Sequence, residues 1–252
     1  VEEGYSTDLT TDHALSFIEQ RDASKPFCLL LHHKAPHRNW LANTKYFGMY
    51  DNVTFPMPET FYDDYETRGS AVRTQKMSVT KDMRWEQDFK VPEMLDTANA
   101  DSWDSYLSLM NEVNRMNPEQ RIAWGKYYFP RNRRLLEARL TGKELDEWKY
   151  QNYIRDYMSV IKSVDESVGR VLDYLDSHGL TDNTIIVYTS DQGFYMGEHG
   201  WFDKRFMYEE SLRTPLLIAY PGHIQPGTVC NKLVQNIDYA PTFLDLAGIS
   251  KP

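Results

Sequence analysis

The chain has 252 residues, enough for one large or two modest domains with a buried core. Hydrophobic residues make up 41% and charged residues 26%, proportions that exclude collagenous, low-complexity and wholly disordered chains. The 28 Lys and Arg against 37 Asp and Glu give a net charge of -9, which disfavours binding to nucleic acid or to an anionic membrane. No apolar run approaches the roughly 20 residues that a membrane helix requires.

The first predicted elements are a helix and a buried strand. A helix is expected from about residues 10–12, where Thr and Asp can cap it, with its apolar residues on one side. The almost wholly apolar residues 26–32 predict a strand buried on both faces, followed directly by a polar loop over residues 33–40. The two cysteines, Cys28 and Cys230, form no disulfide framework and no C-x-x-C pair, so they leave the cellular compartment open.

Residues 41–140 predict an irregular, insertion-like region, because prolines interrupt every long periodic pattern. Short helices are expected near residues 104–115 and 119–127. Connections this long are uncommon in compact domains unless they carry function or pack as arms, and the sequence leaves both possibilities open.

The last part of the chain predicts helices alternating with strands. Thr141 can cap a long helix that ends at Ser177, in which apolar residues recur at steps of three and four. Strands are expected at residues 184–189 and 215–220 and near 233–235, and a helix at 241–246. Nearly all-apolar strands alternating with helices predict an α/β domain with a mainly parallel sheet covered by helices.

Two loops at the expected strand ends hold the candidate functional side chains. Ligands of such sheets gather at the carboxyl ends of strands, where cationic groups suit an anionic substrate and oxygen donors suit a hard metal ion. The candidates are His32, His33, Lys34, His37 and Arg38 in the first loop, and Asp191, Gln192, Glu198, His199, Lys204 and Arg205 in the second.

Each candidate also has an ordinary interpretation. Asp191 can cap a turn, Gln192 can be a loop amide, and a lone histidine or Lys204 can simply be solvated. The joint occurrence of these groups with Gly193, Gly197 and Gly200 favours function, because glycine lets backbone approach a ligand closely.

Several segments together resemble the type I sulfatases. The residues 190–194 (SDQGF), 197–201 (GEHGW), Lys204 and 213–216 (RTPL) resemble one signature block of that family, and 34–37 (KAPH) resembles its sulfate-binding histidine loop. The stretches 4–8 (GYSTD) and 237–242 (IDYAPT) fit the same pattern. These segments span almost the whole chain, and the most similar branch is that of the N-acetylglucosamine-6-sulfatases.

The resemblance implies an alkaline-phosphatase-like α/β fold, here incomplete, a calcium ion, and hydrolysis of sulfate esters on a sulfated glycan or glycosaminoglycan. It implies that Asp191 and Gln192 are metal ligands and that Lys204 contacts both sulfate and nucleophile. It places His37 near the bridging ester oxygen as a leaving-group proton donor, and His199 at the sugar end of the pocket. Lys34 matches no defined family position and is expected to line the substrate pocket.

The family's nucleophile has no match in this chain. Sulfatases attack with formylglycine, made from Cys or Ser in the order Cys/Ser-x-Pro/Ala-x-Arg, and neither Cys28 nor Cys230 fits. The upstream Asp-Asp metal pair is also missing, and one Asp with one Gln cannot supply the six to eight oxygens that calcium takes.

We therefore expect an internal part of a longer protein, inactive alone, without the N-terminal nucleophile segment and the C-terminal subdomain. An exported protein (periplasmic, secreted or lysosomal) is expected, with its leader in the upstream segment. An uncovered sheet edge could also pair two copies of the chain.

Two other functions remain open at this stage. One is a phosphatase or phosphodiesterase of the same superfamily; the other is a pseudoenzyme that binds sulfated glycans without cleaving them. Sequence upstream of Val1 would discriminate them by its nucleophile. A basic stretch could serve a polyanionic glycan, although a solvated helix face is the favoured interpretation; it comprises Arg121, Lys126, Arg131, Arg133, Arg134, Arg139 and Lys143.

Overall fold

The structure is a computed structural model that describes residues 2–250. Contacts along the chain divide it into two compact units. Unit 1 combines Val1–Ser177 with Tyr195–Asp203, and unit 2 combines His178–Phe194 with Lys204–Pro252. Across the described residues, no helix is both long and apolar enough to cross a membrane.

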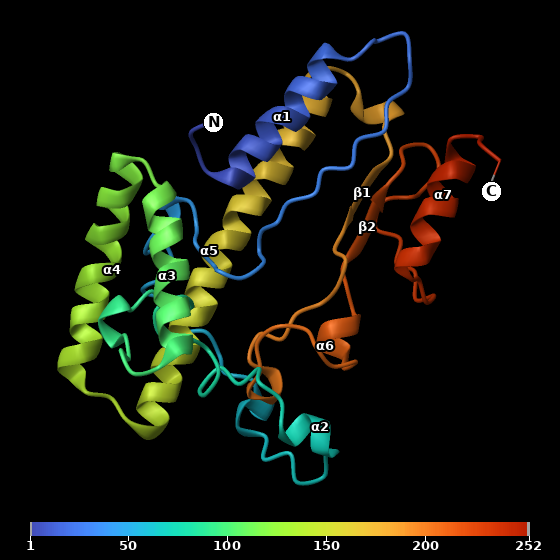
Figure 1. The fold of residues 1–252 in the computed structure, drawn as a ribbon. Coiled ribbons are helices and arrows are strands. Elements are labelled where there is room, and N and C mark those ends of the chain that lie inside the picture. Colours follow the sequence, from blue (N-terminus) through green and yellow to red (C-terminus); the bar gives the residue numbers. More distant parts are fainter. Residues whose placement is uncertain (1, 251–252) are drawn as a thin grey trace. The chain divides into compact units, whose positions relative to one another are not determined.

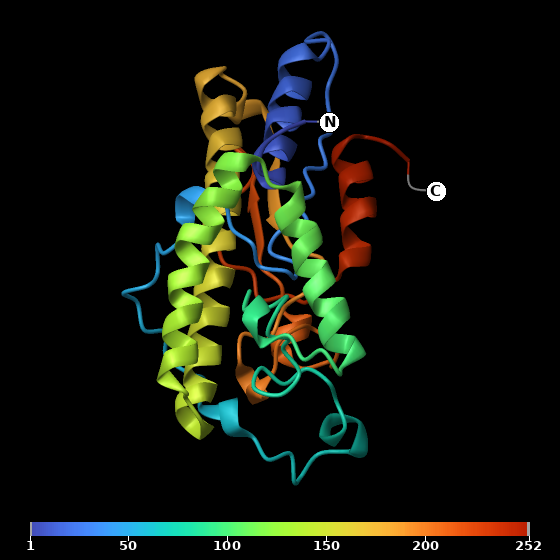
Figure 2. The ribbon, with the colours of Figure 1, turned by 60° about the vertical axis from the view of Figure 1, so that its left-hand side comes forward.

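Unit 1 is built from helices (Figures 1 and 2). They are α1 (Ser6–Gln20), α2 (Ser70–Arg73), α3 (Ala100–Arg115), α4 (Pro118–Ala138) and α5 (Gly142–Ser177), joined by segments with short 3-10 turns. Helix α1 packs along α5, and α3 and α4 lie beside its other half in both views. The long helix predicted for residues 141–177 is confirmed as α5.

Helix α1 begins at Ser6, about one turn earlier than predicted. The hydroxyls of Thr10 and Thr11 donate to the carbonyls of Ser6 and Thr7, 2.8 and 3.0 Å away, and so lie inside the helix instead of capping it. Thr11 is fully buried, as is Ile18 two turns along on the same face. The threonines satisfy their hydroxyls locally and take core positions, which the capping pattern in the sequence did not anticipate.

Helix α4 continues through Pro130, where the sequence predicted an interruption. Its start is fixed by a capping box between Asn117 and Gln120, and it ends at Ala138. An interior proline costs a helix roughly 3 kcal/mol. Trp124 and Tyr128 are almost fully buried on the inner face, and burying two such aromatic side chains offsets a cost of that size.

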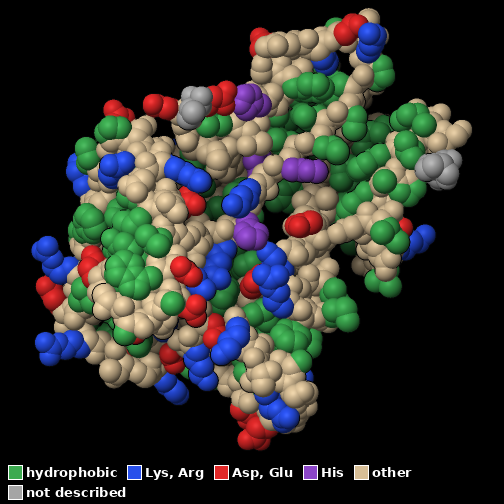
Figure 3. All heavy atoms as spheres, viewed as in Figure 1, with side chains coloured by type: hydrophobic (Ala, Val, Ile, Leu, Met, Phe, Trp, Pro, Cys, Tyr) green, Lys and Arg blue, Asp and Glu red, His purple; other side chains and the backbone are tan. Residues whose placement is uncertain are grey.

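Residues 41–140 supply much of the unit 1 core. Val79, Phe89 and Val91 have no exposed surface, so this stretch packs as part of the unit. Its α3 and α4 also leave hydrophobic side chains at the surface, and Figure 3 shows them gathered on one face of the molecule. The exposed hydrophobic side chains of these two helices are Trp103, Leu107, Ile122, Phe129 and Leu136.

As far as residue 250, unit 2 contains a two-stranded sheet and two α-helices. Strand β1 (Ile186–Thr189) pairs antiparallel with β2 (Leu216–Ala219), with Ile186 opposite Ala219 and Thr189 opposite Leu216. The helices are α6 (Glu209–Leu212) and α7 (Tyr239–Leu246). The hydroxyls of Thr189 and Tyr239 are 3.0 Å apart and join β1 to α7.

The parallel pairing expected between strands is wrong for the described sheet, which holds one antiparallel pair. Residues 26–32 and 233–235, predicted as strands, are not hydrogen-bonded into any sheet of the described chain. Residues 27–32 alternate between half-buried and exposed positions, as an extended segment does. An apolar sequence specifies extended backbone, but a strand also requires a hydrogen-bonding neighbour.

Candidate functional site

The predicted site residues fall into two sets, one in each unit. Unit 1 holds Lys34, His37 and His199, and unit 2 holds Asp191, Gln192 and Lys204. The convergence of the two sets on one anion pocket stays a prediction, and the local structure of each set is described separately.

His37 lies at the exposed turn of the first loop. Its backbone N–H donates to the carbonyl of Lys34 at 2.9 Å, which closes the turn. Its ring Nδ1 lies 2.9 Å from the carbonyl oxygen of Arg38. Because a carbonyl only accepts, Nδ1 carries the proton, and in the neutral ring Nε2 holds the lone pair. The contact fixes the ring's orientation and leaves Nε2 as the atom able to exchange a proton with a ligand.

Two residues that follow this turn, Arg38 and Trp40, anchor it in unit 1. The guanidinium of Arg38 binds both carboxylate oxygens of Asp88, with 2.6 Å from Nε to Oδ1, and the Asp88 side chain has no exposed surface. Trp40 is also fully buried, with its ring centroid 4.7 Å from that of Tyr153 on α5. Sequence reasoning missed Asp88, because it lies 50 positions from its partner and belongs to no motif.

Three atoms of His199 make polar contacts: its ring Nδ1, its backbone N–H and its carbonyl oxygen. Its Nδ1 is 3.1 Å from Oδ2 of Asp63, its backbone N–H donates to the hydroxyl of Thr60 at 3.0 Å, and its carbonyl accepts from the hydroxyl of Tyr65. Burial alone would raise the pKa of Asp63, but hydrogen bonds from the Tyr65 backbone, His199 and Arg68 outweigh it and lower that pKa. This environment fixes the ring of His199 through a carboxylate that the sequence did not reveal.

The glycines around His199 serve protein packing, which corrects their interpretation as points of ligand approach. At Gly197, with φ of 109°, a Cβ would lie 2.6 Å from the Tyr150 ring. At Gly200, with φ of 72°, a Cβ would lie 2.6 Å from the backbone oxygen of Phe61. Both positions therefore require glycine for the close contacts inside unit 1.

Asp191 and Gln192 follow β1 in unit 2, as predicted. The amide of Asn236 donates to the carbonyl of Asp191 at 2.8 Å, and the hydroxyl of Ser190 donates to the carbonyl of Gln192 at 2.9 Å. Gly193 then donates to the carbonyl of Ser211 at 2.8 Å. These backbone contacts hold the turn and leave the Asp191 side chain exposed.

Asp191 and Gln192 carry oxygen ligands of the type that a hard cation binds, but two residues are too few to complete its coordination shell. A carboxylate and an amide oxygen are ligands that calcium accepts, yet calcium takes six to eight oxygens. Within residues 2–250, no three side chains of His, Cys, Asp or Glu are grouped as a metal site. The pair can contribute part of a calcium shell, and further ligands would have to complete it.

The other predicted residues differ in exposure. The ammonium of Lys204 lies 5.7 Å from the ring centroid of Phe194 in unit 2, and its side chain is half-buried. Lys34 and His32 are exposed. Both ring nitrogens of His33 are buried without a hydrogen-bond partner among the described residues, and burial lowers the pKa of this histidine.

The chain belongs to the sulfatase family, whose model matches residues 1–249. It is 48% identical to an N-acetylglucosamine-6-O-sulfatase of Bacteroides thetaiotaomicron, a match that covers 100% of this chain and 44% of that protein. It is 26% identical to the N-acetylglucosamine-6-sulfatase of Capra hircus, over 97% of this chain and 32% of that protein. The chain thus spans less than half the length of these curated relatives.

A solved structure similar to this chain shows the same fold. It superposes with a TM-score of 0.91 at 48% identity, covers 100% of this chain and 50% of the other, and is described as a complex with its substrate D-glucosamine-2-N,6-O-disulfate. The sulfatase, alkaline-phosphatase-like α/β fold expected from the sequence is confirmed. The branch resemblance to N-acetylglucosamine-6-sulfatases is confirmed as well.

Proposed function

We propose that this chain is part of an enzyme that hydrolyses 6-O-sulfate esters on glucosamine-type sugars of sulfated glycans. The observation that carries the proposal is the 48% identity along the whole chain to a protein whose solved structure holds D-glucosamine-2-N,6-O-disulfate. We also propose an exported location, because sulfatases that act on glycans are commonly exported.

Each site residue has its own proposed role in breaking the sulfate ester. Lys204 supplies positive charge to the sulfate oxygens as the bond to the sugar weakens. His37, protonated on Nε2, gives its proton to the leaving sugar oxygen, since Nδ1 is engaged with the Arg38 carbonyl. His199 and Lys34 bind the sugar and its anionic substituents, and Asp63 orients the His199 ring.

The proposed cofactors are calcium and formylglycine. Asp191 and Gln192 would contribute two oxygen ligands to the calcium ion, which when bound polarises the sulfate oxygens. The nucleophile would be a formylglycine from a segment outside this chain.

The test is sulfate release by a full-length protein that contains this chain. Glucosamine 6-sulfate, glucosamine 6-phosphate and a phosphodiester are incubated with the enzyme, and free sulfate and phosphate are measured by ion chromatography. The proposal expects sulfate release that exceeds phosphate release by orders of magnitude. Preferential phosphate release would assign a phosphatase, and binding of the sulfated sugar without release would assign a glycan-binding pseudoenzyme.

A further inference from the structure

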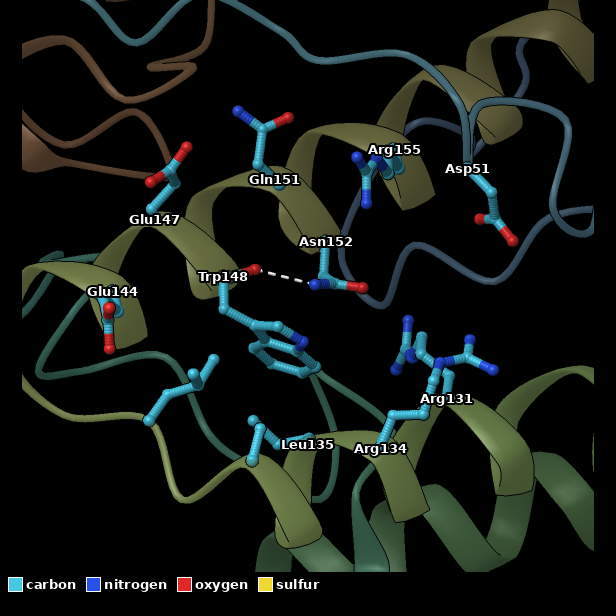
Figure 4. A pocket seen from close by; sticks show the side chains of 12 residues that line it. Asp51, Arg131, Arg134, Leu135, Glu144, Glu147, Trp148, Gln151, Asn152 and Arg155 are labelled. Carbon is cyan, nitrogen blue, oxygen red and sulfur yellow. Dashed lines mark hydrogen bonds between the residues drawn. The ribbon is translucent and has the colours of Figure 1, made fainter.

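Helices α4 and α5 line a cavity in unit 1 that opens to the surface and that the catalytic proposal does not use. It has a volume of about 530 Å³, within the usual range for small-molecule sites. Figure 4 shows the indole of Trp148 between the two helices, with arginines toward one end and carboxylates toward the other. The arginines are Arg131, Arg134 and Arg155, and the carboxylates at the opposite end are Glu144 and Glu147.

Two buried cations share one carboxylate beside the arginine end of the cavity. Lys90 and Arg131 are both more than nine-tenths buried, and they share one buried carboxylate, Asp156. Its Oδ2 is 2.9 Å from the Lys90 ammonium but 3.6 Å from Nη1 of Arg131. Buried cations are costly unless paired, so an anion at this end would be stabilised.

Arg131 retains unused donors at this end. Its Nη2 donates to the carbonyl of Phe89, but Nε and Nη1 are buried and make no hydrogen bond among the described residues. Arg155 donates twice to the carbonyl of Val53, at 3.1 and 2.9 Å, which holds its guanidinium in place. Of the acidic residues that line the cavity, Asp51 is the one at this end, and the Tyr127 hydroxyl donates to it at 2.8 Å.

Arg134 is the adaptable cation of the cavity. Its side chain is exposed, it lines the cavity, and it makes no side-chain hydrogen bond or ion pair among the described residues. Its neighbour Arg133 is also exposed but lies outside the cavity lining. The two arginines therefore form a matched pair in which one can reach a cavity ligand and the other cannot.

We propose that the α4–α5 cavity binds a sugar that carries an oxyanion, with the anion at Arg131, Arg134 and Arg155 and the ring against Trp148. Guanidinium groups match sulfate and carboxylate geometry, and an aromatic face packs against the apolar C–H face of a pyranose. Glu144 and Glu147 accept hydrogen bonds from sugar hydroxyls at the other end. This gives two cations of the basic stretch, Arg131 and Arg134, a ligand site, and it requires no hydrolysis at the catalytic loops.

The test is a titration of the whole chain labelled with ¹⁵N-tryptophan, which gives six indole signals. N-acetylglucosamine 6-sulfate and glucuronate present the two oxyanion sources, and N-acetylglucosamine is the neutral control. We expect the Trp148 signal, assigned with Trp148→Phe, to shift with an oxyanion sugar and much less with the neutral one. The arm that binds more tightly identifies the source, and added salt should weaken the binding.

Variants locate the ligand. Arg134→Ala should weaken the binding about tenfold, as expected for loss of a charge-assisted contact, whereas Arg133→Ala and Lys204→Ala should leave it unchanged. If Arg133→Ala and Arg134→Ala weaken the binding equally, the sugar is attracted by the general positive charge of the helix and not by the cavity, which would overturn the proposal. Equal binding of the neutral sugar, or loss in Lys204→Ala with none in Arg134→Ala, would overturn it too, the latter by placing the ligand at the catalytic loops.

Discussion

Arg38 and Asp88 form a two-point ion pair that ties the His37 loop to the core of unit 1. The carboxylate of Asp88 is wholly buried and also accepts from the backbone N–H of Arg84 at 2.6 Å. The Arg38 guanidinium in addition lies 5.1 Å from the ring centroid of Phe202. The residue next to the proposed proton donor is therefore a structural anchor.

Replacing Arg38 with Ala should destabilise unit 1 by about 3 kcal/mol, since it leaves a buried carboxylate without its counter-charge. All six tryptophans lie in unit 1, so urea unfolding followed by tryptophan fluorescence reports on this unit. The double variant Arg38→Met with Asp88→Leu should lose less stability than Arg38→Ala, because it also removes the buried charge of Asp88. A double variant as unstable as the single one would show that the charge is not the cause.

Gly200→Ala should cost more than the conformational strain of a positive φ. The new Cβ would meet the Phe61 backbone oxygen at 2.6 Å, and backbone cannot move aside as a flexible side chain does. Gly142→Ala is the matched control, with φ of +54° and no atom within 4 Å. We expect about 1 kcal/mol of lost stability for the control and at least twice that for Gly200→Ala. Equal losses in urea unfolding would remove the packing explanation.

The hydrogen bonds that Asp63 accepts from the Tyr65 backbone, His199 and Arg68 outweigh its burial and predict a pH dependence of stability at the acidic end. The folded-state pKa of Asp63 is lowered from its ordinary value of 3.8, so its stabilising contribution is present above that value. It is lost as the pH falls through the folded-state pKa. Thermal unfolding followed by tryptophan fluorescence between pH 5 and 3 should show a steeper loss for the wild type than for Asp63→Asn. Parallel curves would contradict the role of Asp63.

Sequence patterns predicted those parts of the fold whose signal is local. The periodic apolar residues of α5 and the β-branched run of β1 gave elements close to the observed ones. Strand pairing depends on two segments together, so the antiparallel register of β1 with β2 could not be predicted from the sequence of either strand alone. Helix α4 continues through Pro130 because the burial of aromatic side chains offsets the free-energy cost of a proline inside a helix.

The candidate site shows the same division. The positions of Asp191 and Gln192 after a strand and of His37 in a polar loop follow from local sequence. Asp88 and Asp63, which fix the two histidine segments, lie 50 and 136 positions from their partners. No spacing rule connects residues so far apart, since tertiary packing alone brings them together.

His37→Gln should separate proton donation from sulfate binding in a full-length protein that contains this chain. Loss of a general acid lowers kcat by about 10²-fold or more when the leaving group needs a proton, as a sugar alkoxide does. A nitrophenyl sulfate, whose leaving group departs unprotonated, should lose little. The measurement is kcat for both substrates in wild type and variant. Equal loss on both would assign His37 to binding or folding instead of proton transfer.

Lys204→Ala should lower kcat by about 10² or more on both substrates, because charge on the sulfate oxygens is stabilised whatever the leaving group is. Lys232→Ala, which removes an exposed lysine of the same unit, is the matched control and should retain activity. The contrast with His37→Gln makes the pair informative, since one variant responds to the leaving group and the other does not. Near-normal turnover in Lys204→Ala would refute its proposed contact with the transferring sulfate.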